Sequence, residues 1–300
     1  MLRAVTIFFG ITLLVCGIGV AGLLGIFYHF GRGLPDYRQL ADYEPPVTTR
    51  VHAGDGRLLA EYAVQKRVFV PIRAMPLRVI NAFLAAEDAY FYSHPGVNLL
   101  SVFRAAVTNL RYMGTGRRPV GASTITQQVA KTFLLTNEVS IERKIKEAIL
   151  AFRIERAFTK DRILELYLNE IYLGYGSYGV AAAALNYFNK PLDDLTIGEV
   201  AFLAALPKAP NNYNPFSHPE AARGRRDWVV DRMFEEGFIS PAEAEQAENA
   251  SLVIRNRKDV ELVSADYFAE EVRREIAERY GEAQLYRGGL SVRATLDPIH

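Results

Sequence analysis

A long run without charge near the N-terminus constrains the fold of this chain more than any other feature. Residues 5–28 contain no Asp, Glu, Lys or Arg. A helix rises about 1.5 Å per residue, so a run of this length crosses a hydrocarbon core of roughly 30 Å with some tilt. A cleaved signal peptide usually has an apolar region of about 7–15 residues followed by a small-residue cleavage site. This run is longer and leads into Phe27-Tyr28-His29-Phe30, so we predict one uncleaved transmembrane helix over residues 5–30.

The charges beside this helix give little information on its orientation. Arg3 lies on one side, and Arg32 and Arg38 lie on the other, so the positive-inside rule hardly decides. The short tail of residues 1–4 favours a cytoplasmic N-terminus with the rest of the chain outside. Residues 31–47 read as a linker, because Gly33, Pro35 and the Pro45-Pro46 pair disfavour a helix there.

Charge and cysteine content exclude several classes of protein. The formal net charge of the 300 residues is +1, which argues against a general nucleic-acid binder. Cys16 is the only cysteine and lies in the apolar N-terminal run, so no disulfide or cysteine metal site within the chain is possible.

The remaining pattern predicts a mainly α domain with a small β region. Gly54-Asp55-Gly56 is a turn signal within residues 48–70 and predicts a hairpin. Helical periodicity runs from Pro76 to about residue 250, a late helix covers residues 266–280, and residues 290–296 resemble a strand. The apolar residues 97–113 contain Arg104 and Arg111, so they form either a helix on a membrane surface or a core helix with a loop.

An acid-free stretch suggests a site for an anionic ligand. Residues 89–137 contain no Asp or Glu but hold several basic residues, while Glu87 and Glu147 stand at the sequence edges of this region. The basic residues are Arg104, Arg111, Arg117, Arg118 and Lys131.

Glu87 is the first candidate catalytic residue. Ile80, Phe83 and Glu87 share the apolar stripe of one helix. Burial there would raise the pKa of the carboxyl group towards the range useful for a general acid or base. The alternative is a glutamate at a helix end that reaches solvent or a structural partner. Asp88 and His94 are more plausibly structural.

Residues 121–131 form the second candidate segment. Thr124 and Gln127 fit a capping box, and the helix start that it predicts offers backbone N–H groups suited to phosphate. Gln127 and Lys131 lie one turn apart on one helix face and can converge on one anion. An ordinary capped helix with a solvated lysine is the alternative.

Arg143, Lys144 and Glu147 form the third candidate group. Their spacings are i, i+4 and i, i+3, so a surface salt-bridge pattern worth about 0.2–0.5 kcal/mol per pair is favoured when the group is taken alone. Beside the acid-free stretch, the cluster can instead hold a pyrophosphate, with Glu147 binding a metal or assisting the leaving group.

Five ordered motifs resemble those of the peptidoglycan glycosyltransferases, glycosyltransferase family 51. They cover roughly residues 80–235 and comprise Glu87-Asp88-Ala89-Tyr90-Phe91-Tyr92-Ser93-His94-Pro95-Gly96, residues 121–131, Arg143-Lys144-Ile145-Lys146-Glu147, Ile163-Leu164-Glu165-Leu166-Tyr167-Leu168-Asn169, and Leu206-Pro207-Lys208-Ala209-Pro210. The resemblance implies a lysozyme-like, two-lobed fold and the polymerisation of lipid II into β-1,4 glycan strands, with inversion and release of undecaprenyl pyrophosphate. It places the catalytic domain, residues 48–250, on the external face of a bacterial plasma membrane.

The resemblance also implies roles for individual residues. Glu87 is expected to be the base that deprotonates the acceptor hydroxyl, and Glu147 to assist the leaving group or bind Mg²⁺ or Mn²⁺. Asn169 is expected to contact substrate or to hold the cleft together. The pyrophosphate is expected to bind Ser123, Gln127, Lys131, Arg143 and Lys144. Expected partners are lipid II, the growing strand, membrane lipid and other cell-wall synthesis proteins.

The flanks of the motifs are similar to those of the class A penicillin-binding proteins, particularly the 1A type. The similar segments are Tyr43-Glu44-Pro45-Pro46, Gly288-Gly289-Leu290 and Leu296-Asp297-Pro298. Ser-x-x-Lys and Lys-Thr-Gly are both absent, so we expect no transpeptidase activity, with residues 251–300 as an extension towards such a domain. The rival functions are a lysozyme-like lytic transglycosylase or muramidase, and a non-enzymatic cell-wall scaffold.

Overall fold

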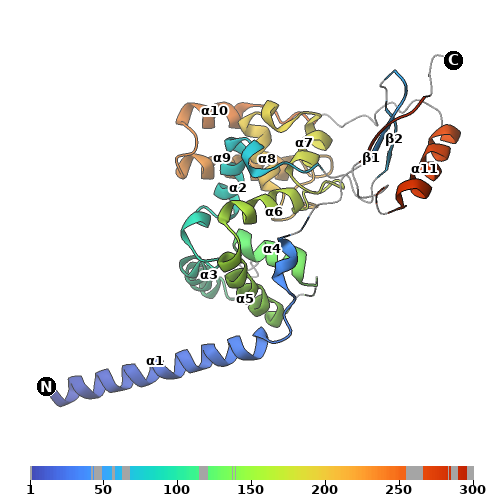
Figure 1. Cartoon of the computed structure of the whole chain (residues 1–300). Coiled ribbons are helices and arrows are strands. Elements are labelled where there is room, and N and C mark those ends of the chain that lie inside the picture. Colours follow the sequence, from blue (N-terminus) through green and yellow to red (C-terminus); the bar gives the residue numbers. More distant parts are fainter. Residues whose placement is uncertain are drawn as a thin grey trace. The chain divides into compact units, whose positions relative to one another are not determined.

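The computed structural model confirms a mainly helical chain (Figure 1). It describes residues 2–41, 43, 49–55, 58–62, 68–114, 121–136, 138, 140–254, 266–282, 284 and 290–295. Pro45-Pro46, Arg117, Arg118 and Gly288-Gly289 therefore lie outside the described residues. The helices are α1 (Leu2–Gly31), α2 (Leu77–Glu87), α3 (Leu99–Arg111), α4 (Ile125–Leu134), α5 (Ile141–Ala157), α6 (Lys160–Glu170), α7 (Val180–Phe188), α8 (Ile197–Ala205), α9 (Pro219–Glu235), α10 (Pro241–Asn249) and α11 (Asp266–Tyr280). The strands are β1 (Thr49–His52), β2 (Leu58–Tyr62) and β3 (Ser291–Arg293).

The chain divides into two compact units. The first contains Met1–Ala41 and Pro95–Phe158, and the second contains Asp42–His94 and Thr159–His300. In the first unit, α5 packs against α4 and against the end of α1. The Arg153 guanidinium donates to the Gly31 carbonyl over 3.1 Å, which ties the last residue of α1 to α5.

Helix α1 matches the predicted transmembrane segment. Its part from Phe9 to Gly31 is long and apolar enough to cross a membrane, and no residue of its most apolar 18-residue window is buried within the described structure. Length and composition are the basis of this assignment, so the helix agrees with membrane anchoring and leaves its orientation to be tested.

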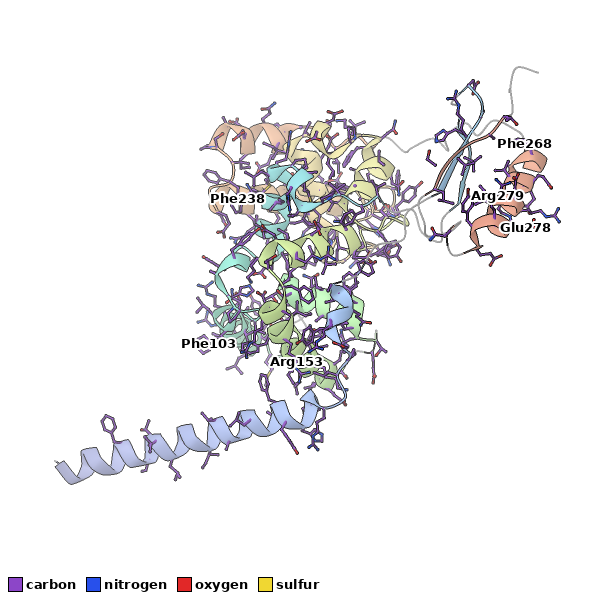
Figure 2. The ribbon with its side chains drawn as sticks, viewed as in Figure 1. Phe103, Arg153, Phe238, Phe268, Glu278 and Arg279 are labelled. Carbon is purple, nitrogen blue, oxygen red and sulfur yellow. The ribbon has the colours of Figure 1, made fainter. Side chains whose placement is uncertain are left out.

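Helix α3 is an amphipathic helix with an exposed apolar face. Asn98 caps its first turn by accepting from the Ser101 amide over 3.0 Å, and none of its residues is buried. Leu99 and Phe103 are 77% and 66% exposed. Phe103 is labelled on α3 in Figure 2. The alternative of a core helix is therefore wrong for α3, because a core helix buries its apolar stripe.

The core of the second unit is built around helix α8. Every residue from Val200 to Ala205 is buried, and α8 packs against α2 and α9. A Cβ on Gly198 would lie 3.2 Å from the Ala247 carbonyl oxygen and 3.3 Å from the Arg226 guanidinium, so the glycine permits this close approach.

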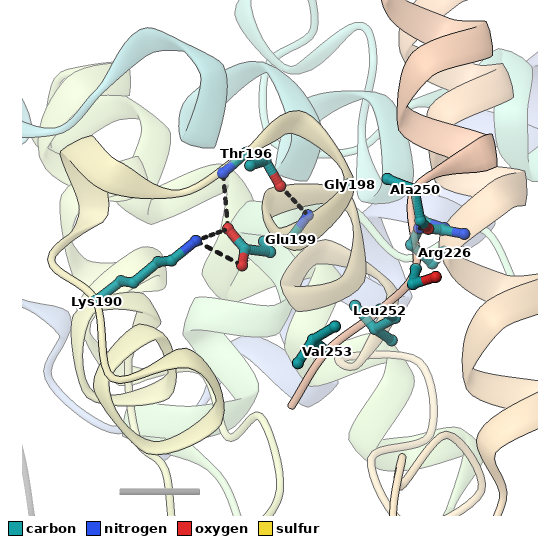
Figure 3. A pocket seen from close by; sticks show the side chains of 9 residues that line it. Lys190, Thr196, Gly198, Glu199, Arg226, Ala250, Leu252 and Val253 are labelled. Carbon is teal, nitrogen blue, oxygen red and sulfur yellow. Dashed lines mark hydrogen bonds and ion pairs between the residues drawn. The ribbon is translucent and has the colours of Figure 1, made fainter. Parts of the chain in front are cut away.

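A cavity of about 200 Å³ beside α8 contains none of the predicted site residues (Figure 3). The charged side chains that line the cavity already have ion-pair or hydrogen-bond partners within the protein. Lys190 Nζ lies 2.8 and 2.9 Å from the two Glu199 carboxylate oxygens, and Glu199 also accepts from the Thr196 amide. The buried Arg226 donates to the carbonyls of Glu248 and Ala250. We therefore interpret this cavity as part of the scaffold.

A three-stranded sheet of order β2-β1-β3 joins the two ends of the second unit's sequence. The predicted hairpin is confirmed, because β1 and β2 pair antiparallel with a register irregularity at Val51/His52. The parallel pairing of β3 with β1 was not predicted. Helix α11 contributes Phe268 and Ile276 to the cluster around the buried Val51. Phe268 is labelled on α11 in Figure 2.

Candidate active site

Glu87 is the last residue of α2 and is half-buried. The fully buried residues of this helix include Val79, Ala82 and Phe83, whereas Ile80 is only partly buried. The buried stripe is therefore shifted by about one residue from the expected line through Ile80, Phe83 and Glu87, and Glu87 lies at the edge of this stripe. This position leaves the residue partly accessible while its backbone is held by the packed helix.

Asp88 and His94 form a buried pair directly after α2. His94 Nε2 lies 2.9 Å from both carboxylate oxygens of Asp88. Lys160 Nζ donates to the His94 carbonyl over 2.7 Å and lies 4.3 Å from the centroid of the Phe91 ring. These contacts agree with the structural reading of both residues, because they fix the turn that follows Glu87.

Two basic residues of the second unit lie within electrostatic reach of Glu87, and the sequence analysis gave neither a role. The pKa of Lys208 is lowered by partial burial and by Arg225, and Glu87 acts in the opposite direction. The pKa of Arg225 is lowered by burial, while Tyr213 and Glu87 act to raise it. Lys208 belongs to the fifth motif, which was the available sequence signal.

The Arg225 side chain is held in place by aromatic rings. Its guanidinium carbon lies 3.6 Å from the centroid of Trp228 and 6.0 Å from that of Tyr213. Its Nε is buried and has no hydrogen-bond partner among the described residues. A partly buried guanidinium whose Nε has unused donor capacity is suited to an anionic or strongly polar ligand.

Tyr167 adds a buried hydroxyl to the same region. Burial raises the pKa of Tyr167 well above its ordinary value, and the charges of Glu87 and Asp88 add to this effect. The hydroxyl has no hydrogen-bond partner within the described residues, and the ring packs edge-on against Phe83 at 6.2 Å between centroids. The phenol therefore stays protonated at neutral pH and can donate to a neighbouring oxygen.

The first unit brings together four of the predicted residues. Glu147 is paired with both Arg143 and Lys144, and Lys144 Nζ also lies 3.0 Å from Ser123 Oγ. The carboxylate of Glu147 is 1% exposed, so the expectation of a surface salt bridge for this group is wrong. The surface pair of α5 is Lys146–Glu142, whose acid is 58% exposed.

The cluster formed by Ser123, Arg143, Lys144 and Glu147 has donor capacity that its carboxylate does not use. Arg143 Nε is buried with no hydrogen-bond partner among the described residues. Lys144 Nζ carries three donors, and two are accounted for by Glu147 and Ser123. Two cations against one carboxylate leave a net positive charge, which suits an anion such as a phosphate group.

The capping box at the start of α4 is confirmed. The Gln127 amide N–H donates to Thr124 Oγ1 over 3.2 Å, and Gln127 Oε1 accepts from the Thr124 amide over 2.9 Å. Gln127 is buried and Lys131 is exposed. Because Oε1 is used by the cap, Gln127 can offer a ligand only its NH₂ group.

Asn169 connects α6 to the segment that precedes α2. Its Oδ1 accepts from the Val70 amide over 2.8 Å, and its Nδ2 donates to the carbonyls of Val70 and Glu165 over 2.9 and 2.8 Å. Both ends of the buried side chain are therefore used by backbone groups. This geometry favours the expected role of holding the scaffold together over direct contact with substrate.

The residues around Glu147 do not form a protein-built site for a divalent cation. No group of three or more Asp, Glu, His or Cys side chains with metal-ligand geometry occurs in the described part of the chain. Mg²⁺ prefers several oxygen ligands, and the Glu147 carboxylate is already neutralised by two cationic side chains. The role of Glu147 as a metal ligand stays a prediction, and no chemical step below depends on it.

Comparison with known proteins identifies the family. The family described as Transglycosylase matches residues 55–234, which is more than half of the chain. This chain belongs to the transglycosylase family. The match includes Glu87, Glu147 and every other predicted site residue.

Relatives of this transglycosylase are similar over almost the whole chain. Penicillin-binding protein 1A of Rickettsia felis is 52% identical over 286 residues, covering 95% of this chain and 36% of the relative. The proteins of the same name from Aquifex aeolicus and Escherichia coli are 46% and 41% identical, covering 94% and 95% of this chain and 39% and 33% of theirs. This transglycosylase chain thus spans about a third of the length of these relatives.

A solved structure is also similar to this transglycosylase. The crystal structure of Penicillin-Binding Protein 1A from Haemophilus influenzae matches with a TM-score of 0.47 and 31% sequence identity. The match covers 84% of this chain and 27% of that chain.

Proposed function

We propose that this chain is a peptidoglycan glycosyltransferase, which polymerises lipid II into β-1,4-linked glycan strands and releases undecaprenyl pyrophosphate. The observation that carries the proposal is the cluster of Ser123, Arg143, Lys144 and Glu147, which is a positively charged anion site in the same unit as the apolar helix α1. A lipid-linked pyrophosphate requires both features. Membership of the transglycosylase family supports the same reaction.

The proposed reaction is a single displacement with inversion at the donor sugar. The acceptor 4-hydroxyl oxygen forms a bond to the anomeric carbon, and the bond from that carbon to the pyrophosphate oxygen breaks. Glu87 takes the hydroxyl proton, and the charge that develops on the pyrophosphate is stabilised by Arg143 and Lys144. Ser123 holds Lys144 in place through the 3.0 Å contact.

Lys208 and Arg225 support Glu87 in this proposal. A general base must carry a negative charge before the reaction, and two nearby cations offset that charge. Arg225 also has the unused buried Nε, which can bind a sugar or phosphate oxygen. Both residues therefore contribute to binding and orientation, while Glu87 performs the proton transfer.

The membrane arrangement is a further part of the proposal. Helix α1 anchors the chain in the bacterial plasma membrane, with its N-terminus in the cytoplasm and the residues that follow α1 outside. Protease digestion of intact spheroplasts tests the orientation. Degradation of the second unit by external protease supports it, whereas protection until the membrane is permeabilised contradicts it.

The function is tested by incubating the purified chain with lipid II in detergent and resolving the products on a gel. Polymer that muramidase digests, with stoichiometric release of undecaprenyl pyrophosphate, supports the proposal. Release of soluble fragments from isolated sacculi, without polymer from lipid II, would instead indicate a lytic enzyme. The absence of both products in a folded chain would favour the scaffold.

A further inference from the structure

The loop between α6 and α7 holds an aromatic residue in a backbone conformation that costs energy. Tyr175 has φ of 51°, and it lies between Gly174 and Gly176, whose φ angles are 79° and 66°. Glycine adopts such angles without strain, whereas a bulky residue rarely does. Strained residues of this kind persist only where the surroundings fix them, and they cluster at ligand-binding positions.

The surroundings of Tyr175 fix the loop at several points. The Ser177 amide donates to the Gly174 carbonyl over 2.8 Å, and the Leu173 amide donates to the Ser177 carbonyl over 2.9 Å. Asn186 donates to the buried Ser177 hydroxyl over 2.9 Å. The Tyr187 hydroxyl donates to the Leu173 carbonyl over the same distance. The loop is therefore rigid, and it presents the Tyr175 ring in one place.

The ring of Tyr175 forms an exposed aromatic surface with Phe216. Their centroids are 5.2 Å apart with an interplanar angle of 44°, and the residues are 46% and 50% exposed. Tyr187 supports the pair from the buried side, with its centroid 5.9 Å from that of Tyr175. Folding alone does not require a strained tyrosine to place its ring at the surface beside a second exposed ring.

This aromatic surface adjoins the residues that surround Glu87. Phe216 follows Tyr213 on the same loop, and the Tyr213 ring contacts the Arg225 guanidinium. A Cβ on Gly174 would lie 3.3 Å from Pro210 Cβ, so the Tyr175 loop packs against the loop that carries Lys208 and Tyr213. The two rings thus lie beside the group of residues that contains the proposed base.

We propose that Tyr175 and Phe216 form a stacking platform for one pyranose ring of the β-1,4-linked hexosamine strand. The inference rests on the proposed function and adds a sugar-binding position to it. A β-1,4-linked hexosamine carries its ring substituents equatorially, so its axial C–H bonds form flat apolar faces. The faces of aromatic rings carry partial negative charge and attract such C–H groups.

The platform is tested by binding, independently of catalysis. The full chain in detergent is titrated with a soluble β-1,4-linked GlcNAc–MurNAc tetrasaccharide, and binding is followed by calorimetry and by saturation-transfer NMR. Tyr175→Ala and Phe216→Ala should each weaken binding about fivefold to tenfold, since each removes one aromatic contact. Tyr175→Phe keeps the ring and should bind as the unaltered chain does.

Two further variants separate binding from folding. Tyr175→Asn removes the ring, but asparagine tolerates a positive φ, so the thermal midpoint should be kept while binding falls. Phe234→Ala removes an aromatic residue on α9 that is also 46% exposed, and it should change neither property. Equal affinity in the unaltered chain, Tyr175→Ala and Phe216→Ala would overturn the platform. The platform would also be overturned if Tyr175→Ala lost binding only because it unfolded, while the folded Tyr175→Asn variant bound the tetrasaccharide normally.

The test also distinguishes failure of the platform from failure of the proposed function. If the chain makes no polymer but binds the tetrasaccharide through Tyr175, the platform stands and the glycosyltransferase proposal falls. If it makes polymer and the ring variants bind and polymerise normally, the platform alone falls.

Discussion

Replacing Glu147 with glutamine tests the cluster of Ser123, Arg143, Lys144 and Glu147 most directly. Glutamine has nearly the same shape but no charge, so the variant leaves the Arg143 guanidinium, which is 12% exposed, without its ion pair. Removing one partner of a buried pair costs about 3–5 kcal/mol. The glutamine oxygen still accepts one hydrogen bond, which returns about 1 kcal/mol. Lys144 is half-exposed and contributes about 0–1 kcal/mol.

The net expectation is that Glu147→Gln destabilises the first unit by about 2–5 kcal/mol. Hydrogen exchange of the α5 amides measures this locally, which matters because the chain has two units and need not unfold in one step. Glu142→Gln is the matched control, since it removes a surface pair from the same helix and should leave the exchange unchanged.

Inorganic pyrophosphate supplies the second half of this test. The variant cluster carries one more net positive charge, so pyrophosphate should protect α5 more strongly in Glu147→Gln than in the unaltered chain. A variant with the unaltered exchange rate, or one that pyrophosphate protects less, would refute the view that Glu147 balances a buried cationic anion site. Polymerisation by this variant is expected to be slower, because tighter binding of the pyrophosphate makes product release harder.

Three further predictions concern other parts of the chain. Glu87→Gln should lower lipid II polymerisation by at least about 10²-fold with an unchanged circular dichroism melt, and near-normal polymer yield would remove Glu87 as the base. The pKa of Lys208 is lowered, so as pH rises its charge is lost at a lower pH than that of an ordinary lysine. Lys208→Arg keeps the charge and should move the alkaline limb of the pH–activity profile to higher pH. An unmoved limb would show that deprotonation of Lys208 does not cause the loss of activity at alkaline pH. The exposed apolar face of α3 is expected to contact the membrane. In nanodiscs, with Cys16 replaced by serine, a spin label at Phe103→Cys should be relaxed more by oxygen than by an aqueous nickel complex. A label at Leu77→Cys, a position on α2 that is 69% exposed, should show the reverse.

Local sequence signals predicted the elements of this fold well. The capping box at Thr124, the hairpin turn at Gly54 and the long apolar N-terminal run each depend on neighbouring residues, and each is observed. The burial of Glu147 was not predicted, because the i, i+4 spacing to Arg143 is the same in a surface pair and in a buried one.

Contacts between distant segments explain the rest of what the sequence did not predict. The sequence left two roles for Asn169, contact with substrate or holding the cleft together. Its hydrogen bonds to Val70, 99 residues away, favour the structural role. Lys208 and Arg225 gained their relation to Glu87 through the packing of α2 and α9 around α8. Sequence periodicity does not predict which distant residues come together in the fold. The charge and spacing of each residue do predict the chemistry that it can perform in the site.

The pairing of β3 with β1 has a consequence for how this chain is made. Arg293 donates to the carbonyl of Gly54, which lies 239 residues earlier in the sequence. A ribosome adds about 5–20 residues per second, so roughly 12–48 seconds separate the synthesis of the two segments. Throughout this interval the β1 edge has no β3 to pair with and is open to other extended segments. We therefore expect the hairpin to need protection from mispairing while the rest of the chain is synthesised.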